Sequence, residues 1–410
     1  MLGPALTGRV LHISAADAEG GAARSAFRIH DGLRTLGWSS RMLVGVRRTD
    51  DADVRPLKRN VAWRAADRAC AAVLDRLDLQ YVLYPSSFGV ALDPWFRESQ
   101  VVQLYNVHGS YFSHSALPVL SRRRPLVWRL SDMWALTGHV AYSYDCERWR
   151  HGCGSCPYLG EYPRLRRDTT AVLFRWKDAV YRRSRITVVA PSRWLEEIAR
   201  ESPLLGRFSV RRIANGLDLQ VFRPHPRDEA RRALGLDPER PVVLFSSLER
   251  NDRRKGGDVL AGALSSLADL DFQLAVLGPE ASGLGREVAA LGTIRDDERL
   301  ALAYAAADVF VLPALAENLP NVAVESIACG TPVVASAVGG IPDAVRDGET
   351  GLLVPPGRAP ELAGAMRALL ADDELRARLA RQARAVAEAE FAAERESGEY
   401  AALYEELLAV

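Results

Sequence analysis

Lysines, cysteines and long apolar runs are scarce in this chain of 410 residues. The scarcity of cysteines excludes a disulfide-rich protein, and the lack of long apolar runs excludes a predicted membrane span. Only three of its 53 basic residues are lysines, at positions 58, 177 and 255. Five cysteines are too few for a disulfide framework, which predicts a reducing cytoplasmic compartment. No uncharged apolar stretch approaches the roughly 20 residues of a membrane span. The apolar run at residues 10–13 is too short and too polar for the core of a signal peptide.

The remaining composition is that of a globular protein, with 48% hydrophobic and 26% charged residues. Its length predicts two domains. The net charge of +1 conceals a split, because residues 1–200 hold 30 Lys and Arg against 19 Asp and Glu, whereas residues 201–410 hold 23 against 33. Nucleic acid is not an expected partner, since no binding module or aromatic stripe accompanies the arginines.

Short aliphatic runs alternate with amphipathic helical patterns, which predicts two α/β domains with parallel sheets. One series begins with a strand at residues 9–14, and the second begins at residues 242–245. A segment with Asn-Gly and two prolines separates them and reads as a connection between domains. The predicted organisation is an N-terminal domain (1–212), a linker (213–226), a C-terminal domain (227–385) and C-terminal helices that cross back to the N-terminal domain (386–410).

Two glutamates follow the apolar run at residues 309–312. Glu317 is expected in a loop at the carboxyl end of a parallel strand, where ligands of open α/β sheets bind. A helix is expected to begin near Asn321 and to aim its N-terminus at the same place, which favours a phosphate guest. Glu325 lies about one turn into that helix. Carboxylates beside a diphosphate would repel it unless they accept from sugar hydroxyls.

Cations for such a phosphate are expected in the loop after the strand at 242–245. Arg250 and Lys255 occur there, next to Gly256 and Gly257, which allow close backbone approach. A guanidinium fork and a compact ammonium suit the oxygens of a diphosphate.

These motifs together resemble the retaining nucleotide-sugar glycosyltransferases of family 4, including those of exopolysaccharide gene sets. Nearly the whole chain shares the resemblance, which rests on several motifs in the right order: the two glutamates, residues 328–335, 339–343 and 347–355, the pair Arg250 and Lys255, and Asn215 to Asp218.

The resemblance implies a GT-B fold, in which two Rossmann-like domains face each other across a cleft, and a retaining transfer from a nucleoside-diphosphate (NDP) sugar without an essential metal. By this resemblance the N-terminal domain would be the acceptor side and the C-terminal domain would bind the nucleotide sugar. Glu317 would be catalytic and contact the donor sugar near its reacting face, and Glu325 would bind the ribose. The other donor-binding residues implied are Gly20, Gly21, Arg250, Lys255, Asn318, Leu319, Pro320, Asn321 and Val322.

The first domain departs from the family at Ser131, where many members carry a sugar-contacting histidine. His108, at the end of a predicted strand, and Asp132 are the substitute candidates for a catalytic group that faces the acceptor.

A cysteine-rich segment gives a second departure. Cys146, Cys153, Cys156 and His139 resemble the zinc-binding loop of some members, but Val140 stands where those members commonly have a fourth cysteine. Structural zinc, free thiols and a reversible disulfide are the alternatives.

The expected partners are an NDP-sugar donor and a glycan or lipid-linked acceptor. Arginine clusters at 122–124, 164–167 and 182–183 are either a solvated surface or a contact with anionic membrane, which would place the enzyme peripherally at the inner membrane face. Two alternatives to a transferase remain. One is a catalytically weak nucleotide-sugar-binding scaffold, and the other is a GT-B phosphorylase or synthase.

Overall fold

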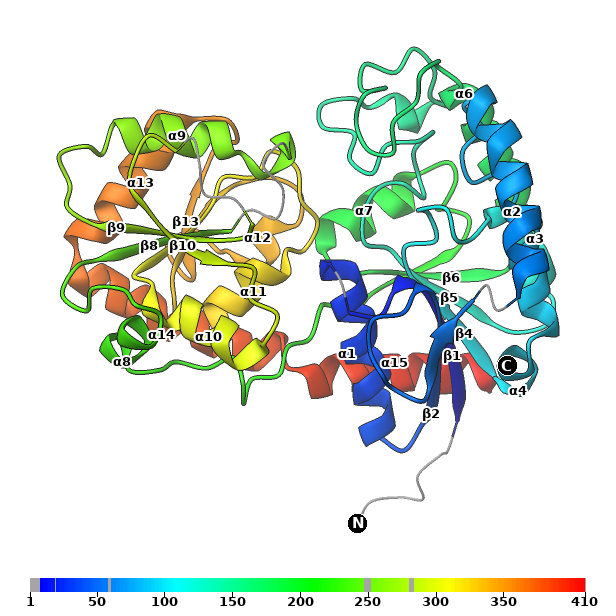
Figure 1. Cartoon of the computed structure of the whole chain (residues 1–410), viewed down its shortest axis with the longest axis horizontal. Helices are drawn as coiled ribbons and strands as arrows, with labels where there is room; N and C mark the ends of the chain where they lie inside the picture. The colour runs from blue at the N-terminus through cyan, green and yellow to red at the C-terminus, as the bar shows by residue number, and fades with distance from the viewer. Residues whose placement is uncertain (1–7, 19, 58–59, 247–251, 280–283, 410) are drawn as a thin grey trace. The chain divides into compact units, whose positions relative to one another are not determined.

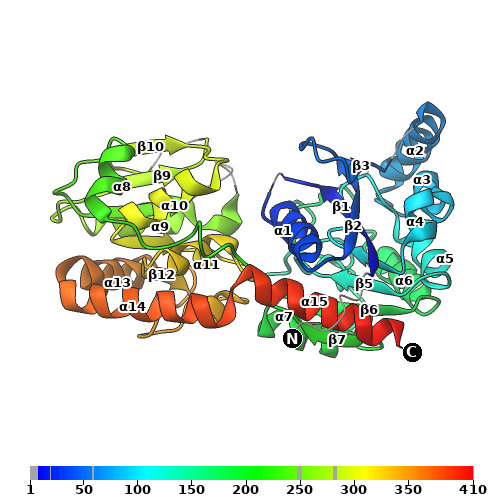
Figure 2. The same ribbon diagram turned by 90° about the horizontal axis from the view of Figure 1, so that it is seen from below.

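The computed structural model of the chain describes residues 8–18, 20–57, 60–246, 252–279 and 284–409. These form two compact units (Figures 1 and 2). The N-terminal unit consists of residues 1–216 together with 394–410, and the C-terminal unit of residues 217–393. The division after Gly216 falls within the connection expected at 213–226. After Ala393 the chain becomes part of the N-terminal unit again.

The described part of the N-terminal unit contains one sheet whose seven strands pair in parallel. In spatial order they are β3 (Val54–Pro56), β2 (Ser39–Val46), β1 (Arg9–Ala16), β4 (Val101–Leu104), β5 (Leu126–Arg129), β6 (Ile186–Ala190) and β7 (Ser209–Arg212). The order reverses between β1 and β4. At such a switch point the loops after the two strands diverge and leave room for a ligand.

The helices of this unit connect the strands, and the last one returns from the far end of the chain. They are α1 (Gly21–Thr35), α2 (Val61–Leu74), α3 (Pro85–Gly89), α4 (Pro94–Glu98), α5 (Leu117–Ser121), α6 (Thr170–Tyr181), α7 (Arg193–Glu201) and α15 (Ala393–Leu408). Tyr400, Leu403 and Tyr404 of α15 are buried in the same cluster as Trp38 and Met42, so the C-terminal helix packs on the N-terminal unit.

The described part of the C-terminal unit holds a sheet of six parallel strands. Their spatial order is β10 (Val288–Gly292), β9 (Gln273–Leu277), β8 (Val242–Ser246), β11 (Val309–Leu312), β12 (Val333–Ser336) and β13 (Gly351–Val354). The helices are α8 (Arg227–Ala233), α9 (Gly257–Ser265), α10 (Asp297–Ala306), α11 (Asn321–Ala328), α12 (Ile341–Ala344), α13 (Ala359–Ala371) and α14 (Asp373–Glu390).

The apolar runs of the C-terminal strands explain why this sheet forms. Every residue of β11 and β12 is buried, as are the first four residues of β8. A parallel sheet covered by helices on both faces requires such continuous apolar strands. The predicted pair of parallel-sheet Rossmann-like domains is confirmed. The short strands β3, β7, β10 and β13 and the helices α2 to α4 were not predicted.

Candidate functional site

The C-terminal unit brings its predicted site residues to the switch point of its sheet. β8 and β11 are neighbours at which the strand order reverses. A 3-10 turn, η5 (Arg253–Lys255), and then α9 follow β8, whereas the loop with Glu317 and then α11 follow β11. The residues after these two strands therefore meet at one edge of the sheet, as predicted for Glu317 and Lys255.

Two glycines allow the loops of this edge to approach closely. Gly256 has φ +71°, and a Cβ there would lie 1.9 Å from the carbonyl oxygen of Pro313. Gly339 has φ +58°, and a Cβ there would lie 1.8 Å from the carbonyl oxygen of Glu317. Larger side chains would displace the backbone that presents Glu317.

Glu317 is the centre of an ion cluster at this edge. Its Oε2 accepts from Lys255 Nζ at 2.9 Å and from an Arg254 guanidinium nitrogen at 2.5 Å, and Asp252 contacts the same guanidinium at 3.0 Å. The Glu317 residue is only 8% exposed. Burial by itself would raise the pKa of Glu317, but Lys255 and Arg254 lower this pKa to about 2. Glu317 is therefore a carboxylate at physiological pH.

Arg254 is the residue of this cluster that sequence reasoning missed. Arg250, which was predicted instead, lies outside the described residues. The only available signal was position, because Arg253, Arg254 and Lys255 are consecutive. A pattern of charges does not tell which of three neighbouring side chains turns toward the carboxylate.

Glu325 has a different neighbour. It is 4% exposed in α11, and its Oε2 accepts a hydrogen bond of 3.0 Å from the Tyr304 hydroxyl of α10. The structure thus brings Glu325 to Tyr304 and does not show it in the Glu317 ion cluster. The remaining predicted residues lie between the two glutamates: Asn318 and Leu319 are buried, Pro320 caps α11, and Asn321 and Val322 begin it half-buried.

In the N-terminal unit, Gly20 and Gly21 lie where β1 gives way to α1. Gly20 precedes the helix with φ +87° and ψ 157°, and a Cβ there would meet nothing within 4 Å. Backbone conformation, rather than crowding, is therefore the reason for glycine at this position.

The two alternative acceptor-side candidates are in direct contact. His108 follows β4, Asp132 follows the neighbouring β5, and His108 Nε2 lies 2.9 Å from Asp132 Oδ2. The other Asp132 oxygen accepts from the Trp134 backbone nitrogen at 2.8 Å. Since a carboxylate only accepts, the neutral imidazole carries its proton on Nε2, and its Nδ1 is a hydrogen-bond acceptor. Nδ1 lies 3.4 Å from the Tyr162 hydroxyl.

A buried lysine, Lys177 of α6, contacts the segment next to this pair. Lys177 Nζ is buried and donates to the backbone carbonyl oxygens of Trp134 and of Thr137, the latter at 3.0 Å. Its ammonium also lies 3.4 Å from the centre of the Trp134 ring, and that ring packs against His108 with centroids 5.2 Å apart. Ser131, at the position of the family's histidine, accepts from Arg129 at 3.2 Å instead.

The cysteine-rich segment forms a small hollow of about 20 Å³. Cys146, Cys153 and Cys156 line it together with Val140, and His139 Nδ1 lies 3.9 Å from Cys156 Sγ. Within the described residues, no group of three or more His, Cys, Asp or Glu side chains is arranged to hold a metal ion. Burial raises the pKa of Cys153 to about 11, and a bound cation would lower this pKa again. Structural zinc, free thiols and a reversible disulfide therefore stay as the alternatives for this segment.

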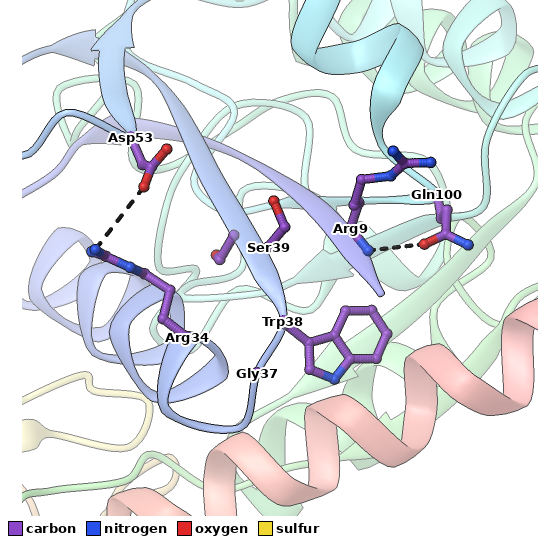
Figure 3. A pocket seen from close by; sticks show the side chains of 8 residues that line it. Arg9, Arg34, Gly37, Trp38, Ser39, Asp53 and Gln100 are labelled. Carbon is purple, nitrogen blue, oxygen red and sulfur yellow. Dashed lines mark hydrogen bonds and ion pairs between the residues drawn. The ribbon is translucent and has the colours of Figure 1, made fainter. Parts of the chain in front are cut away.

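A larger hollow of about 700 Å³ lies elsewhere in the N-terminal unit (Figure 3). Arg9 and Ser39, at the amino ends of β1 and β2, contribute to its wall with Arg34, Asp53 and Gln100. Arg34 is already paired with Asp51 at 2.8 Å. The hollow is thus at the edge of the sheet opposite to the switch-point loops, and we do not assign the chemistry to it.

No helix in the described ranges is both long and apolar enough to cross a membrane.

Comparison with known proteins identifies the C-terminal unit most clearly. Residues 226–386 match the family model described as glycosyl transferases group 1. The D-inositol 3-phosphate glycosyltransferase of Rhodococcus erythropolis (strain PR4 / NBRC 100887) is 40% identical over 190 residues, which cover 42% of this chain and 42% of that protein. The enzyme of that name from Mycobacterium sp. (strain KMS) is 44% identical over 153 residues, or 34% of each chain. The chain therefore matches less than half the length of these relatives.

Solved structures match over nearly the whole chain. Sucrose-phosphate synthase from Thermosynechococcus elongatus aligns with a TM-score of 0.69 at 23% identity and covers 98% of this chain and 99% of its own. Anabaena HepE, solved in complex with UDP, aligns with a TM-score of 0.67 at 21% identity and covers 97% and 100%. The chain thus has the GT-B fold, and its residues 226–386 match the glycosyl transferases group 1.

Proposed function

We propose that this chain is a retaining glycosyltransferase that moves a sugar from an NDP-sugar to a glycan, lipid-linked or small-molecule acceptor in polysaccharide or glycoconjugate biosynthesis. The observation that carries the proposal is the cluster of Glu317, Lys255 and Arg254 at the switch point of a group 1 glycosyl transferase domain. HepE complexes with UDP and with UDP-glucose support the donor class.

The cluster has the charges that this reaction needs. The bond between the anomeric carbon and the phosphate oxygen breaks, and its electron pair leaves with the diphosphate. The acceptor oxygen bonds to the same face of the anomeric carbon, which retains the configuration, and its proton passes to the departing phosphate. Lys255 and Arg254 stabilise the negative charge, while the Glu317 carboxylate stabilises the positive charge that develops on the sugar. Catalysis in this scheme uses no metal.

Other donor contacts are assigned from the same loops. Asn318 to Val322 and the N-terminus of α11 would orient the sugar and the phosphate, and Glu325 would accept from the ribose after exchanging its Tyr304 partner. Gly20 and Gly21 would let backbone amides approach the donor phosphate. Arg250 would contact the donor diphosphate together with Lys255.

On the acceptor side, His108 and Asp132 act as a pair. Asp132 holds the imidazole in one tautomer, and Nδ1 would exchange the Tyr162 hydroxyl for an acceptor hydroxyl and orient it. A lipid-linked acceptor would bring the protein to an anionic membrane face.

One observation favours a second candidate, a nucleotide-sugar-binding scaffold with weak or no turnover. Ser131 replaces the histidine of the family, and its hydroxyl is engaged by Arg129. The two candidates differ in whether the donor is consumed.

A panel of nucleotide sugars tests the proposal. Thermal shift identifies the nucleotide sugar that binds, and mass spectrometry and NMR then identify the products formed with candidate acceptors. A transferase releases NDP and forms a glycoside with the donor's anomeric configuration. Free sugar phosphate as the product would indicate a phosphorylase, an inverted glycoside would contradict the retaining mechanism, and binding without any product would indicate a scaffold.

A further inference from the structure

Helix α2 presents an apolar face to solvent. Of its fourteen residues only Asp67 is buried. Val61 is 72% exposed and Val73 is 58% exposed, and Ala62, Ala65, Ala69 and Ala72 are exposed as well. At 100° per residue these six side chains fall on one side of the helix. In both ribbon views α2 stands at the periphery of the N-terminal unit with no element outside it.

Such a face is unusual because surface helices normally turn polar residues outward. The inward side of α2 combines polar and apolar contacts. Asp67 accepts from the Ser86 backbone nitrogen at 3.0 Å and from the Ser86 hydroxyl at 2.6 Å. Trp63 lies against Gly89, and Ala71 packs on the buried cluster of Tyr81, Tyr84 and Trp134. Leu77, in the turn that follows α2, extends the apolar surface and is 49% exposed.

Arginines border this face. Arg64 and Arg68 lie along one edge of α2, Arg76 lies in the following turn, and all three are exposed. None of the ion pairs found among the described residues includes them. Asp75 is the one exposed acid between residues 61 and 77, so the net charge of this surface is positive.

A second basic loop is attached to the same surface. Arg166 donates from its backbone nitrogen to Asp78 at 2.9 Å and from its guanidinium to the Asp75 carbonyl at 3.2 Å. The side chains of Arg166 and Arg167 are 76% and 74% exposed. The loop also carries Tyr162, whose hydroxyl lies beside His108. The α2 surface is therefore connected by direct contacts to the proposed acceptor-side pair.

The other arginine clusters expected at a membrane are engaged elsewhere. Arg124 donates to the backbone carbonyls of Arg97 and Ser99, and Arg182 pairs with Asp178 at 2.8 Å. Local contacts therefore hold these two arginines.

We infer that α2, the turn through Leu77 and the loop at residues 162–167, together called the α2 surface, dock on an anionic lipid bilayer. The apolar face would enter the headgroup region while the arginines contact lipid phosphates. This inference deepens the proposed function and rests on it only for the lipid-linked acceptor.

The positive charge of the α2 surface favours an anionic bilayer over a second copy of the chain as its binding partner. A two-fold interface places the same patch on both partners. Arg64 and Arg68 would then face the arginines of the other copy, which disfavours that interface. An anionic lipid surface meets the same arginines with opposite charge.

Vesicle flotation of the full chain tests this inference without donor or acceptor. We expect binding to vesicles that contain phosphatidylglycerol and none to pure phosphatidylcholine. Arg64→Glu with Arg68→Glu should weaken the binding about 30-fold or more, given the contribution of each arginine near an anionic surface. Val61→Ser with Val73→Ser should weaken it without changing charge. The matched control is Arg299→Glu with Arg381→Glu, which makes the same charge change at exposed positions of the C-terminal unit.

Equal flotation of the Arg64→Glu, Arg68→Glu variant and the control would overturn the inference. So would a dimer in analytical ultracentrifugation that the variant abolishes, because a second copy would then occupy the face. Transfer to a water-soluble acceptor should be unchanged in the variant. A chain that catalyses transfer but binds no vesicles would contradict the membrane inference and leave the proposed function intact. A chain that binds vesicles but catalyses no transfer would contradict the proposed function and leave the membrane inference intact.

Discussion

Glu317 holds two cations in the described structure, and a donor diphosphate would compete with it for both. Lys255 and Arg254 each contact the same oxygen, Oε2. A diphosphate would draw the two cations toward its own oxygens and leave Glu317 with a sugar hydroxyl as partner. Before the donor binds, the buried Glu317 carboxylate and the two cations neutralise one another. When the donor binds, its diphosphate would replace Glu317 as the partner of the cations.

Removal of the ammonium of Lys255 should weaken donor binding. A hydrogen bond to a charged group contributes about 1.5–3 kcal/mol, so Lys255→Met should raise the Kd for UDP by about 10-fold to 100-fold. Isothermal titration calorimetry measures this change. Arg299→Met removes an exposed cation from the same unit and should leave the Kd unchanged. An unchanged Kd for Lys255→Met would remove this lysine from the donor site.

The pair His108 and Asp132 should matter for turnover more than for donor binding. His108→Ala is expected to lower kcat by about 100-fold, the cost of a misplaced reactant, because the imidazole orients the acceptor hydroxyl whose proton passes to the phosphate. Asp132→Asn should lower it too, because an amide can stabilise the wrong tautomer. The exposed His151→Ala serves as the control. Steady-state kinetics at saturating donor separates the effects, and an unchanged kcat for His108→Ala would exclude the histidine from the reaction.

At this scale the sequence predicts residue types better than partners. His108 and Asp132 are predicted as alternatives, although they follow neighbouring parallel strands and lie 2.9 Å apart. Their contact depends on β4 pairing with β5, which the apolar runs alone do not reveal. Arg254 was missed because the backbone of η5, rather than residue type, directs its side chain to Glu317.

At the scale of elements, the loops of the C-terminal site depend on glycines. Gly339→Ala would force a Cβ against the Glu317 carbonyl and also impose a residue with a side chain at φ +58°. We expect strongly reduced transfer and a lower Tm. Gly364→Ala in α13 meets nothing within 4 Å and should stabilise the helix slightly. Transfer assays and thermal unfolding of the two variants make the comparison. Full activity in Gly339→Ala would show that the loop tolerates the displacement.

The packing of α1 on β1 and β2 should make stability depend on pH. Burial lowers the pKa of His12 well below its ordinary value of 6.5, and burial lowers that of His30 to about 4. Both rings share the Ser40 hydroxyl. Below pH 6.5 the unfolded chain binds protons that the folded chain does not, so stability falls as the pH decreases from 6.5 toward 4. The loss from His30 alone is roughly 3 kcal/mol.

Urea unfolding at several pH values, followed by a signal from the N-terminal unit, measures this dependence. His30→Gln should flatten the slope between pH 6.5 and 4, whereas His151→Gln at an exposed position should not. A slope that is the same in both variants would contradict the role given to buried histidine.

Elements with a continuous apolar run are those that the sequence predicts correctly. β8, β11 and β12 are buried on both faces and are predicted within one residue of either end. α2 is not predicted, because its inward side has Asp67 and only a few apolar residues, such as Ala71, instead of a full apolar stripe. Most apolar residues of α2 lie on the side that faces solvent, whereas a helix that packs on a core has them on the inward side.

At the scale of the whole molecule, the split between a basic first half and an acidic second half acquires local meaning. Some arginines of the basic half contact backbone carbonyls or nearby acids, and others, among them Arg64, Arg68, Arg76, Arg166 and Arg167, are exposed at the α2 surface. The acidic half nevertheless carries the proposed diphosphate site, in which two adjacent cations are held by one glutamate. Net charge over a domain therefore says little about its site.

Donor turnover by the wild type and by Glu317→Gln, with NDP binding measured on the same samples, tests whether the Glu317 site is that of a transferase. The wild type should convert an NDP-sugar to NDP and glycoside. Glu317→Gln should bind NDP but lose most of this turnover, since the amide lacks the charge that stabilises the developing cation. Turnover by Glu317→Gln equal to that of the wild type would exclude this role of the carboxylate. A wild type that binds NDP-sugar and consumes none with any acceptor would exclude a transferase.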